Sequence, residues 1–198
     1  MCQFIETIKV VDGEVKNIKE HIDRVNYTRS QNWEKYNKII DNDIIKLINK
    51  KEGTIKLRFT YDNINIYQPT CTQYRLKQVK HIKLITDNTI EYAFKSIDRE
   101  SLNKLKLRVK QDEEVLIVKC NRLTDTSYTN IALYDGIKWV TPSIPLLNGT
   151  KRRQLIKQRK LIEVDLTPKD IGKYKAISLI NAMIELEELI LPITEVRL

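Results

Sequence analysis

Short apolar runs that alternate with polar residues recur along this chain, and turn-forming pairs separate several of them. An Asp-Gly pair at 12–13 follows the run at 4–11, and an Asp-Asn pair at 62–63 divides the run at 54–68. Such pairs between alternating runs are typical of β-hairpins. Because a hairpin joins antiparallel neighbours, we expect sheets that are largely antiparallel or mixed.

Segments with helical spacing lie between the predicted strands. Apolar residues recur at intervals of three and four over 17–33, and similar patterns occupy 42–50, 98–109 and 149–160. Further strands are predicted at 81–86, 114–119, 130–134 and 161–166, and Thr-Pro at 167–168 predicts the start of a short helix. We therefore predict a mixed α and β class with two small domains, 1–80 and 81–198.

Composition limits the classes of protein that this chain can be. Its 198 residues can bury a core, and 41% hydrophobic with 31% charged residues is typical of a soluble globular protein. No apolar run approaches the length of a membrane span, and the first residues lack a basic start followed by an apolar stretch. We expect a cytoplasmic protein that does not bind a membrane.

The metal-binding residue types are few and scattered. Cys2, Cys71 and Cys120 lie far apart, and neither they nor His21 and His81 have the spacing of a metal site. We expect ordinary thiols in a reducing compartment and no metal.

The net charge of +9 raises the alternative of a non-enzymatic module that binds nucleic acid. The lysines are spread along the whole chain, however, and the densest basic cluster, 151–160, contains no aromatic residue. Binding of single-stranded nucleic acid usually combines basic residues with exposed aromatic rings. We therefore expect no nucleic-acid partner, and a local basic patch can equally serve a phosphorylated small molecule.

Three polar features could carry chemistry. Lys95 follows aromatic and apolar residues, where partial desolvation would favour a free amine able to form a Schiff base. Asp125 lies among hydroxyl and amide side chains, and a carboxylate held by such donors stays ionised. Gly149 precedes a predicted helix whose first backbone N–H groups could bind phosphate. Each feature also has an ordinary explanation: a surface lysine, a turn that begins a strand, and simple helix initiation.

Six segments, taken in order, resemble the fold-type IV enzymes that use pyridoxal 5′-phosphate (PLP). These enzymes include branched-chain and D-amino acid aminotransferases and 4-amino-4-deoxychorismate lyase. The similar segments are FIETIKVVDG at 4–13, EHIDRV at 20–25, FKSIDRESL at 94–102, LTDTSYTNIALYDGIKWVTP at 123–142, LLNGTKRRQLI at 146–156, and ISLINAM at 177–183 with LPI at 191–193. The resemblance implies a D-amino acid aminotransferase-like fold with PLP between its two domains.

The resemblance also implies a role for each matching residue. Lys95 would form the Schiff base with PLP and then move protons, and Asp125 would keep the pyridine nitrogen protonated. Arg24 would pair with the cofactor phosphate. The remaining cofactor-binding residues would be Gly149, Thr150, Lys151, Asn181 and Ala182.

This sequence departs from the family pattern at two of these positions. Asp125 stands where the family usually has glutamate, so its side chain is one methylene shorter. The family's G-I-T-R is replaced by G-T-K-R, which moves the hydroxyl back to Thr150 and places Lys151 at the usual threonine.

Within the family, two chemistries compete. Arg99 lies four residues after Lys95, as in the lyase pattern K-x-x-N-R, and the compact chain also favours the lyase. An aminotransferase acting on a branched-chain or D-amino acid remains the alternative. Arg58 and Arg99 are candidates to bind substrate carboxylates, and either could instead be structural. The resemblance further implies a small-molecule substrate and a homodimer.

Overall fold

The structure, a computed structural model, describes residues 3–50 and 52–197, so that Cys2 lies outside the described residues. Contacts divide the chain into two compact units. The first ends at Arg75 and also contains Phe94–Asp98, and the second comprises Leu76–Ala93 and Arg99–Leu198. The short segment that carries Lys95 therefore packs with the first unit, whereas the predicted boundary after residue 80 puts it in the second domain.

The first unit is built on an antiparallel four-stranded sheet in the order β2-β1-β3-β4. Asp12 and Gly13 both have positive φ angles, as the tight turn between β1 and β2 requires. This confirms the predicted hairpin. The strands are β1 (Phe4–Val11), β2 (Glu14–Val15), β3 (Thr54–Tyr61) and β4 (Ile66–Gln73).

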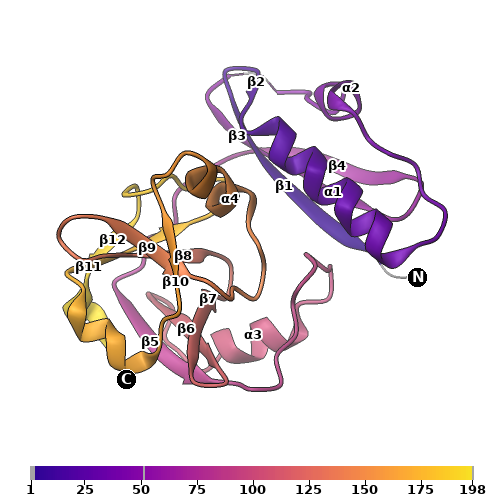
Figure 1. Cartoon of the computed structure of the whole chain (residues 1–198). Coiled ribbons are helices and arrows are strands. Elements are labelled where there is room, and N and C mark those ends of the chain that lie inside the picture. The colour runs from indigo at the N-terminus through magenta and orange to yellow at the C-terminus, as the bar shows by residue number, and fades with distance from the viewer. Residues whose placement is uncertain (1–2, 51, 198) are drawn as a thin grey trace. The chain divides into compact units, whose positions relative to one another are not determined.

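The helix α1 (Ile18–Asn32) packs on this sheet, as the spacing of its apolar residues predicts (Figure 1). Val25 is buried in one core with Ile8, Leu57 and Phe59 of the sheet. The next helix, α2 (Asp41–Ile45), is shorter than the predicted 42–50. The residues after it leave the helix but still pack against the same core through Leu47.

The edge strand β4 extends through residues that the sequence analysis assigned to a polar segment beginning at Pro69. Pairing between β3 and β4 shifts register between Arg58 and Thr60, opposite Gln68 and Pro69. Proline cannot donate a ladder hydrogen bond, and a bulge on an edge strand accommodates it. The local proline signal was therefore overridden by pairing with β3.

The second unit contains a five-stranded sheet, β10-β9-β8-β11-β12, and a four-stranded sheet, β13-β5-β6-β7. Both mix parallel and antiparallel pairs, which confirms the predicted class. The strands are β5 (His81–Thr86), β6 (Glu113–Lys119), β7 (Arg122–Thr126), β8 (Asn130–Tyr134), β9 (Trp139–Pro142), β10 (Ile162–Val164), β11 (Ala176–Ile180), β12 (Ile190–Pro192) and β13 (Val196–Arg197).

Two α-helices cover the sheets of the second unit. In α3 (Glu100–Lys106), Leu102 and Leu105 pack with Val115 and Ile117 of β6. In α4 (Thr150–Lys157), Leu155 packs in a second core with strands of the five-stranded sheet. Two 3-10 helices complete the unit, η1 (Pro168–Lys173) and η2 (Ile193–Glu195).

Strand β7 was not predicted, because its sequence is polar. Thr124, Asp125 and Thr126 nevertheless lie buried in it. Polar side chains enter a protein interior when hydrogen bonds satisfy them, and a periodicity of apolar residues cannot reveal that. The polar segment is thus an interior strand, and its carboxylate is enclosed.

Within the described residues, no helix combines the length and apolar character needed to cross a bilayer. The same residues contain no group of three or more His, Cys, Asp or Glu side chains arranged to hold a metal ion.

Candidate active site

A buried ion cluster in the first unit joins β1 to α1. Glu6 points from β1 into the interior and is fully buried. His21 on α1 lies 2.6 Å from the carboxylate through its Nδ1, and Arg24, one turn later, donates to both carboxylate oxygens through Nε and Nη2. The i, i+3 spacing puts His21 and Arg24 on one helix face, so both reach the same carboxylate.

These contacts set the protonation states of the cluster. Burial by itself would raise the pKa of Glu6, but the charge of Arg24 and the hydrogen bond from His21 outweigh it and lower that pKa to about 2. Burial is also the main cause that lowers the pKa of His21. At neutral pH the cluster is therefore an ionised carboxylate between a guanidinium and a neutral imidazole.

Lys95 lies in the short segment that runs beside β1. Its carbonyl accepts the N–H of Ile5 at 2.8 Å, and the next residue, Ser96, forms a β-bridge with Phe4. The side chain is half-buried, as the sequence predicted, although no regular strand ends there. Burial is the first cause that lowers the pKa of His21, and the positive charge of Lys95 acts in the same direction.

Asp125 forms the corresponding polar centre of the second unit. Its Oδ1 accepts a hydrogen bond from Asn130 Nδ2, and its Oδ2 accepts the backbone N–H of Leu147, both at 2.8 Å. Burial raises the pKa of Asp125 to about 7. The two N–H donors and the charge of Arg152 act in the opposite direction but only partly offset the burial.

This geometry corrects one expectation. The sequence predicted a carboxylate held by hydroxyl and amide side chains. The amide of Asn130 does hold it, but the neighbouring hydroxyls have other partners. Thr124 donates to a carbonyl of β6, Thr126 and Thr129 bond each other at 2.7 Å, and Ser127 donates to the buried Glu114 at 2.6 Å. They shape the turn from β7 to β8, and the pKa of Asp125 stays raised because neutral donors compensate its burial incompletely.

The start of α4 lies next to this carboxylate through Asn130. Gly149 is the N-cap residue of the helix, and Asn130 Oδ1 occupies the position that a Cβ of Gly149 would need. The first backbone N–H groups of a helix have no partner within it. Thr150 and Lys151, which begin the helix, are both buried, so the sequence prediction of an anion site there is compatible with the structure.

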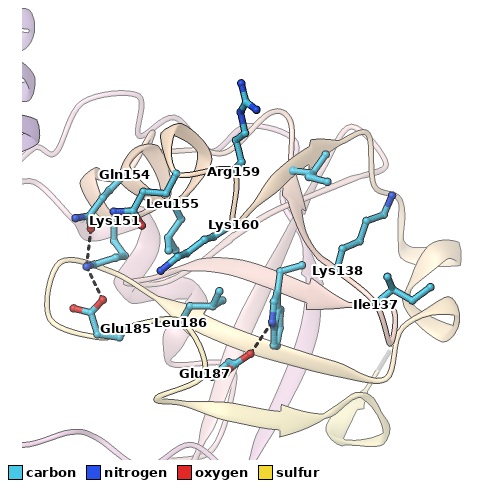
Figure 2. Close-up of a pocket in the computed structure, with 13 residues that line it drawn as sticks. Ile137, Lys138, Lys151, Gln154, Leu155, Arg159, Lys160, Glu185, Leu186 and Glu187 are labelled. Atoms are coloured by element: carbon cyan, nitrogen blue, oxygen red, sulfur yellow. Dashed lines mark hydrogen bonds and ion pairs between the residues drawn. The ribbon is translucent and has the colours of Figure 1, made fainter.

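The amine of Lys151 is turned into a pocket of about 720 Å³ beside α4 and β9 (Figure 2). There it donates to Gln154 Oε1 at 2.8 Å and to Glu185 Oε2 at 2.6 Å. Arg152 is likewise buried and paired with Glu163. Two residues of the basic cluster at 151–160 are therefore internal and paired with carboxylates.

Of the other predicted site residues, Asn181 and Arg99 have side-chain hydrogen bonds to backbone carbonyls. Asn181 donates to the carbonyl of Tyr128 at 3.3 Å, and Ala182 follows it in a half-buried turn. Arg99 donates to the carbonyl of Ser127 at 2.6 Å and lies over the ring of Tyr92. Arg58 is half-buried in β3, in register with Thr7 and Thr70.

Comparison with known proteins shows the family of this chain. Residues 66–196 match the family described as amino-transferase class IV, and this span is more than half of the chain. The chain belongs to the class IV aminotransferases. This family of PLP-dependent enzymes is the one that the six sequence segments resemble.

Two relatives have nearly the same length as this class IV enzyme. An uncharacterized protein of Haemophilus influenzae is 31% identical, with 92% of this chain and 98% of that protein covered. A crystal structure from Haemophilus somnus 129PT, of a protein provisionally assigned as a 4-amino-4-deoxychorismate lyase, is 30% identical with a TM-score of 0.86, covering 94% of this chain and 98% of that one.

A more distant structure shows the same fold. The branched-chain aminotransferase of Thermoproteus uzoniensis is 14% identical with a TM-score of 0.76, covering 98% of this chain and 78% of that one. The predicted aminotransferase-like fold is therefore confirmed.

The residues of this class IV enzyme fit PLP. The neutral donors on Asp125 leave its charge uncompensated, which suits a protonated ring nitrogen, and a glycine-capped helix start suits a phosphate. PLP, when bound to a lysine, supplies an electron sink for a carbanion at the substrate. Within the second unit, Asp125 would hold the ring proton and the first amides of α4 would bind phosphate. The cofactor-bearing role of Lys95, which lies in the first unit, stays a prediction.

Arg24 is held within the first unit by Glu6. The resemblance implies that it binds the cofactor phosphate, but here its guanidinium is engaged by Glu6. Its phosphate role remains a prediction.

Glu6 was not selected from the sequence, although it carried a signal as an acidic residue within the largely apolar opening of β1. Asn130 is the amide side chain that the sequence predicted beside Asp125. Its contact with Gly149 was not predicted, because it joins positions 19 residues apart and no local pattern shows it.

Proposed function

We propose that this class IV enzyme is a 4-amino-4-deoxychorismate lyase, which eliminates pyruvate from its substrate to give p-aminobenzoate, a folate precursor. The observation that supports this choice is the 30% identity with the provisionally assigned lyase of Haemophilus somnus over nearly the full length of both chains. The branched-chain aminotransferase above shares only 14% identity and shows the fold alone.

The proposed reaction needs one base and no second substrate. Lys95 would remove the proton from the ring carbon that bears the amino group. The bond between the neighbouring ring carbon and the enolpyruvyl oxygen would then break, and the oxygen would leave with the electron pair. Protonation of the released enolpyruvate gives pyruvate, while the ring becomes aromatic as p-aminobenzoate.

Asp125 would assist by holding the proton of the cofactor ring nitrogen. Its pKa of about 7 allows it to ionise when a cation comes into contact with it, because the opposite charge offsets the cost of burial. Arg58 and Arg99 are the proposed partners of substrate carboxylates. The contact of Arg99 with Tyr92 and Ser127 would keep its guanidinium in one orientation.

The test is product formation without an amino-group acceptor. The purified protein, saturated with PLP, is given enzymatically prepared 4-amino-4-deoxychorismate and no 2-oxo acid. We expect p-aminobenzoate, followed by fluorescence, and an equal amount of pyruvate, followed with lactate dehydrogenase. Formation of neither product, together with amino transfer from a branched-chain or D-amino acid to 2-oxoglutarate, would replace the lyase with an aminotransferase.

Lys95→Ala provides the matched control for this assay. It should abolish both products and the visible absorption band that borohydride removes from the wild-type protein. Lys9→Ala, which changes an ordinary lysine of β1, should leave both readouts unchanged.

We also propose that the enzyme acts in the cytoplasm as a homodimer, as the family resemblance implies. Light scattering of the purified protein tests the dimer, and a monomeric mass at working concentration would contradict it.

A further inference from the structure

The carboxylate of Asp125 is linked to the loop before α4 by a closed set of hydrogen bonds. Asn130 Nδ2 donates to Asp125 Oδ1 and to the carbonyl of Leu147, each at 2.8 Å. The N–H of Leu147 donates to Asp125 Oδ2 at 2.8 Å. A side-chain amide has two N–H donors, so both donors of Asn130 are committed to this ring of contacts.

The oxygen of the same amide rests against Gly149. A Cβ at Gly149 would overlap Asn130 Oδ1. The backbone of Gly149 has φ −65° and ψ 148°, which any residue adopts, so the absence of a side chain is required by Asn130 and not by the backbone. Asn130 therefore touches the carboxylate and the N-cap of α4 at once.

We propose that Asn130 is a positioning residue that holds Asp125 in a fixed place relative to the phosphate-binding start of α4. This inference rests on the proposed PLP function and deepens it. The pyridine ring of PLP is rigid and its phosphate is attached through a single methylene, so a site that binds both ring nitrogen and phosphate must hold its carboxylate and its amides within a narrow range of separations. The short side chain of Asp125 makes that constraint stricter, because it has fewer rotatable bonds than glutamate.

The contacts around Asp125 also affect the pKa of its carboxyl group. The hydrogen bonds from Leu147 and Asn130 and the charge of Arg152 on α4 all lower the pKa of Asp125, against the larger effect of burial. The guanidinium of Arg152 is itself held by Glu163 and the carbonyl of Pro142. Removing the Asn130 donor should therefore raise the pKa of Asp125 and leave it protonated at neutral pH.

The experiment measures the dissociation constant of PLP between about pH 6 and pH 9 for wild type, Asn130→Ala and Asn130→Ser. The ratio of the Asn130→Ala constant to the wild-type constant should be about tenfold at pH 6 and fall to about twofold at pH 9, where Asp125 is ionised in both proteins. Asn130→Ser retains one donor, so its dissociation constant for PLP should lie between those of wild type and Asn130→Ala.

Thr141→Ala is the matched control. Thr141 is fully buried on β9 and donates to the carbonyl of Ile131, the residue after Asn130, without contacting Asp125. Its loss should lower stability while leaving the ratio of PLP constants independent of pH. A ratio for Asn130→Ala that is equally independent of pH would overturn the positioning role and leave the PLP function standing.

Gly149→Ala tests the same contact without removing a donor, in case Asn130→Ala fails to fold. It should weaken PLP binding with the same pH dependence, and combining it with Asn130→Ala should give less than the sum of the two effects. If the changes in the free energy of PLP binding for the two substitutions were strictly additive, that result would contradict the contact between Gly149 and Asn130. If the wild-type protein binds no PLP at any pH, the proposed function and this inference both fail, and that result is seen before any substitution is made.

Discussion

Glu6 and Asp125 are both buried carboxylates, one in each unit, yet their environments have opposite effects. Glu6 is surrounded by Arg24 and His21, and its pKa is lowered to about 2. Asp125 receives only neutral N–H donors at hydrogen-bonding distance, and its pKa is raised to about 7. The difference lies in whether a cation of the protein itself contacts the carboxylate.

This difference separates a structural ion cluster from a binding position. A buried anion with a resident cation is already compensated, and breaking the pair costs stability. A buried carboxylate without a resident cation is uncompensated, so its charged form is favoured when a ligand brings a cation into contact with it. We therefore infer that Asp125 of the second unit, and not Glu6 of the first, is suited to bind a protonated cofactor ring.

The largest effect should come from Glu6→Gln. It leaves the Arg24 guanidinium buried without its anion, and we expect the free energy of unfolding to fall by about 3–5 kcal/mol. Urea denaturation at pH 7 measures it. Glu14→Gln, which breaks an exposed pair with Lys16, is the control and should change little. A small effect of Glu6→Gln would remove the contrast between the two carboxylates.

Asp125→Asn should act in the opposite direction on the cofactor-free protein. Between about pH 4 and pH 7 the folded wild type keeps the Asp125 proton that the unfolded chain has lost, so its free energy of unfolding falls as pH rises and levels off above about pH 7. The fall is on the order of 4 kcal/mol at most. Asp125→Asn should remove this component, as denaturation curves at several pH values will show.

With PLP present, Asp125→Asn should be unfavourable, which is the opposite of its effect on the cofactor-free protein. Asp125→Asn cannot offer a negative charge to the ring nitrogen, so PLP should bind on the order of tenfold or more weakly than to wild type. Spectrophotometric titration measures this. Equal affinity in the two proteins would mean that Asp125 is not the partner of the ring.

The smallest effect should follow from Lys151→Met. The amine of Lys151 is committed to Gln154 and Glu185, while its predicted cofactor contact uses the backbone amide. PLP affinity should change by less than about threefold, in contrast with Asp125→Asn. A loss as large as that of Asp125→Asn would show that the side chain, too, acts on the cofactor.

Local sequence patterns predicted most of the fold. The alternation over 54–68 and the helical spacing over 17–33 were confirmed because each element buries its apolar face against a neighbour. Strand β7 escaped prediction because its buried face is polar. The hairpin over 54–68 predicted only the first part of β4, because a proline usually ends a strand, whereas here a bulge accommodates Pro69.

The candidate site was predictable only through the order of its motifs. Lys95, Asp125 and Gly149 are individually ordinary residues, and their predicted roles depend on the family pattern. The structure confirmed the amide of Asn130 as one partner of the carboxylate and added the backbone N–H of Leu147, whereas the hydroxyls around it bond elsewhere. Hydrogen-bond partners that are distant in sequence leave no periodic signal.

The sequence by itself determined the mixed class, most of the element order and the family, because these depend on local periodicity and on short motifs in a fixed order. Only the tertiary structure decided how each carboxylate is charged. That outcome depends on burial and on which donors or cations come within about 3 Å, and both are properties of packing between segments far apart in the chain.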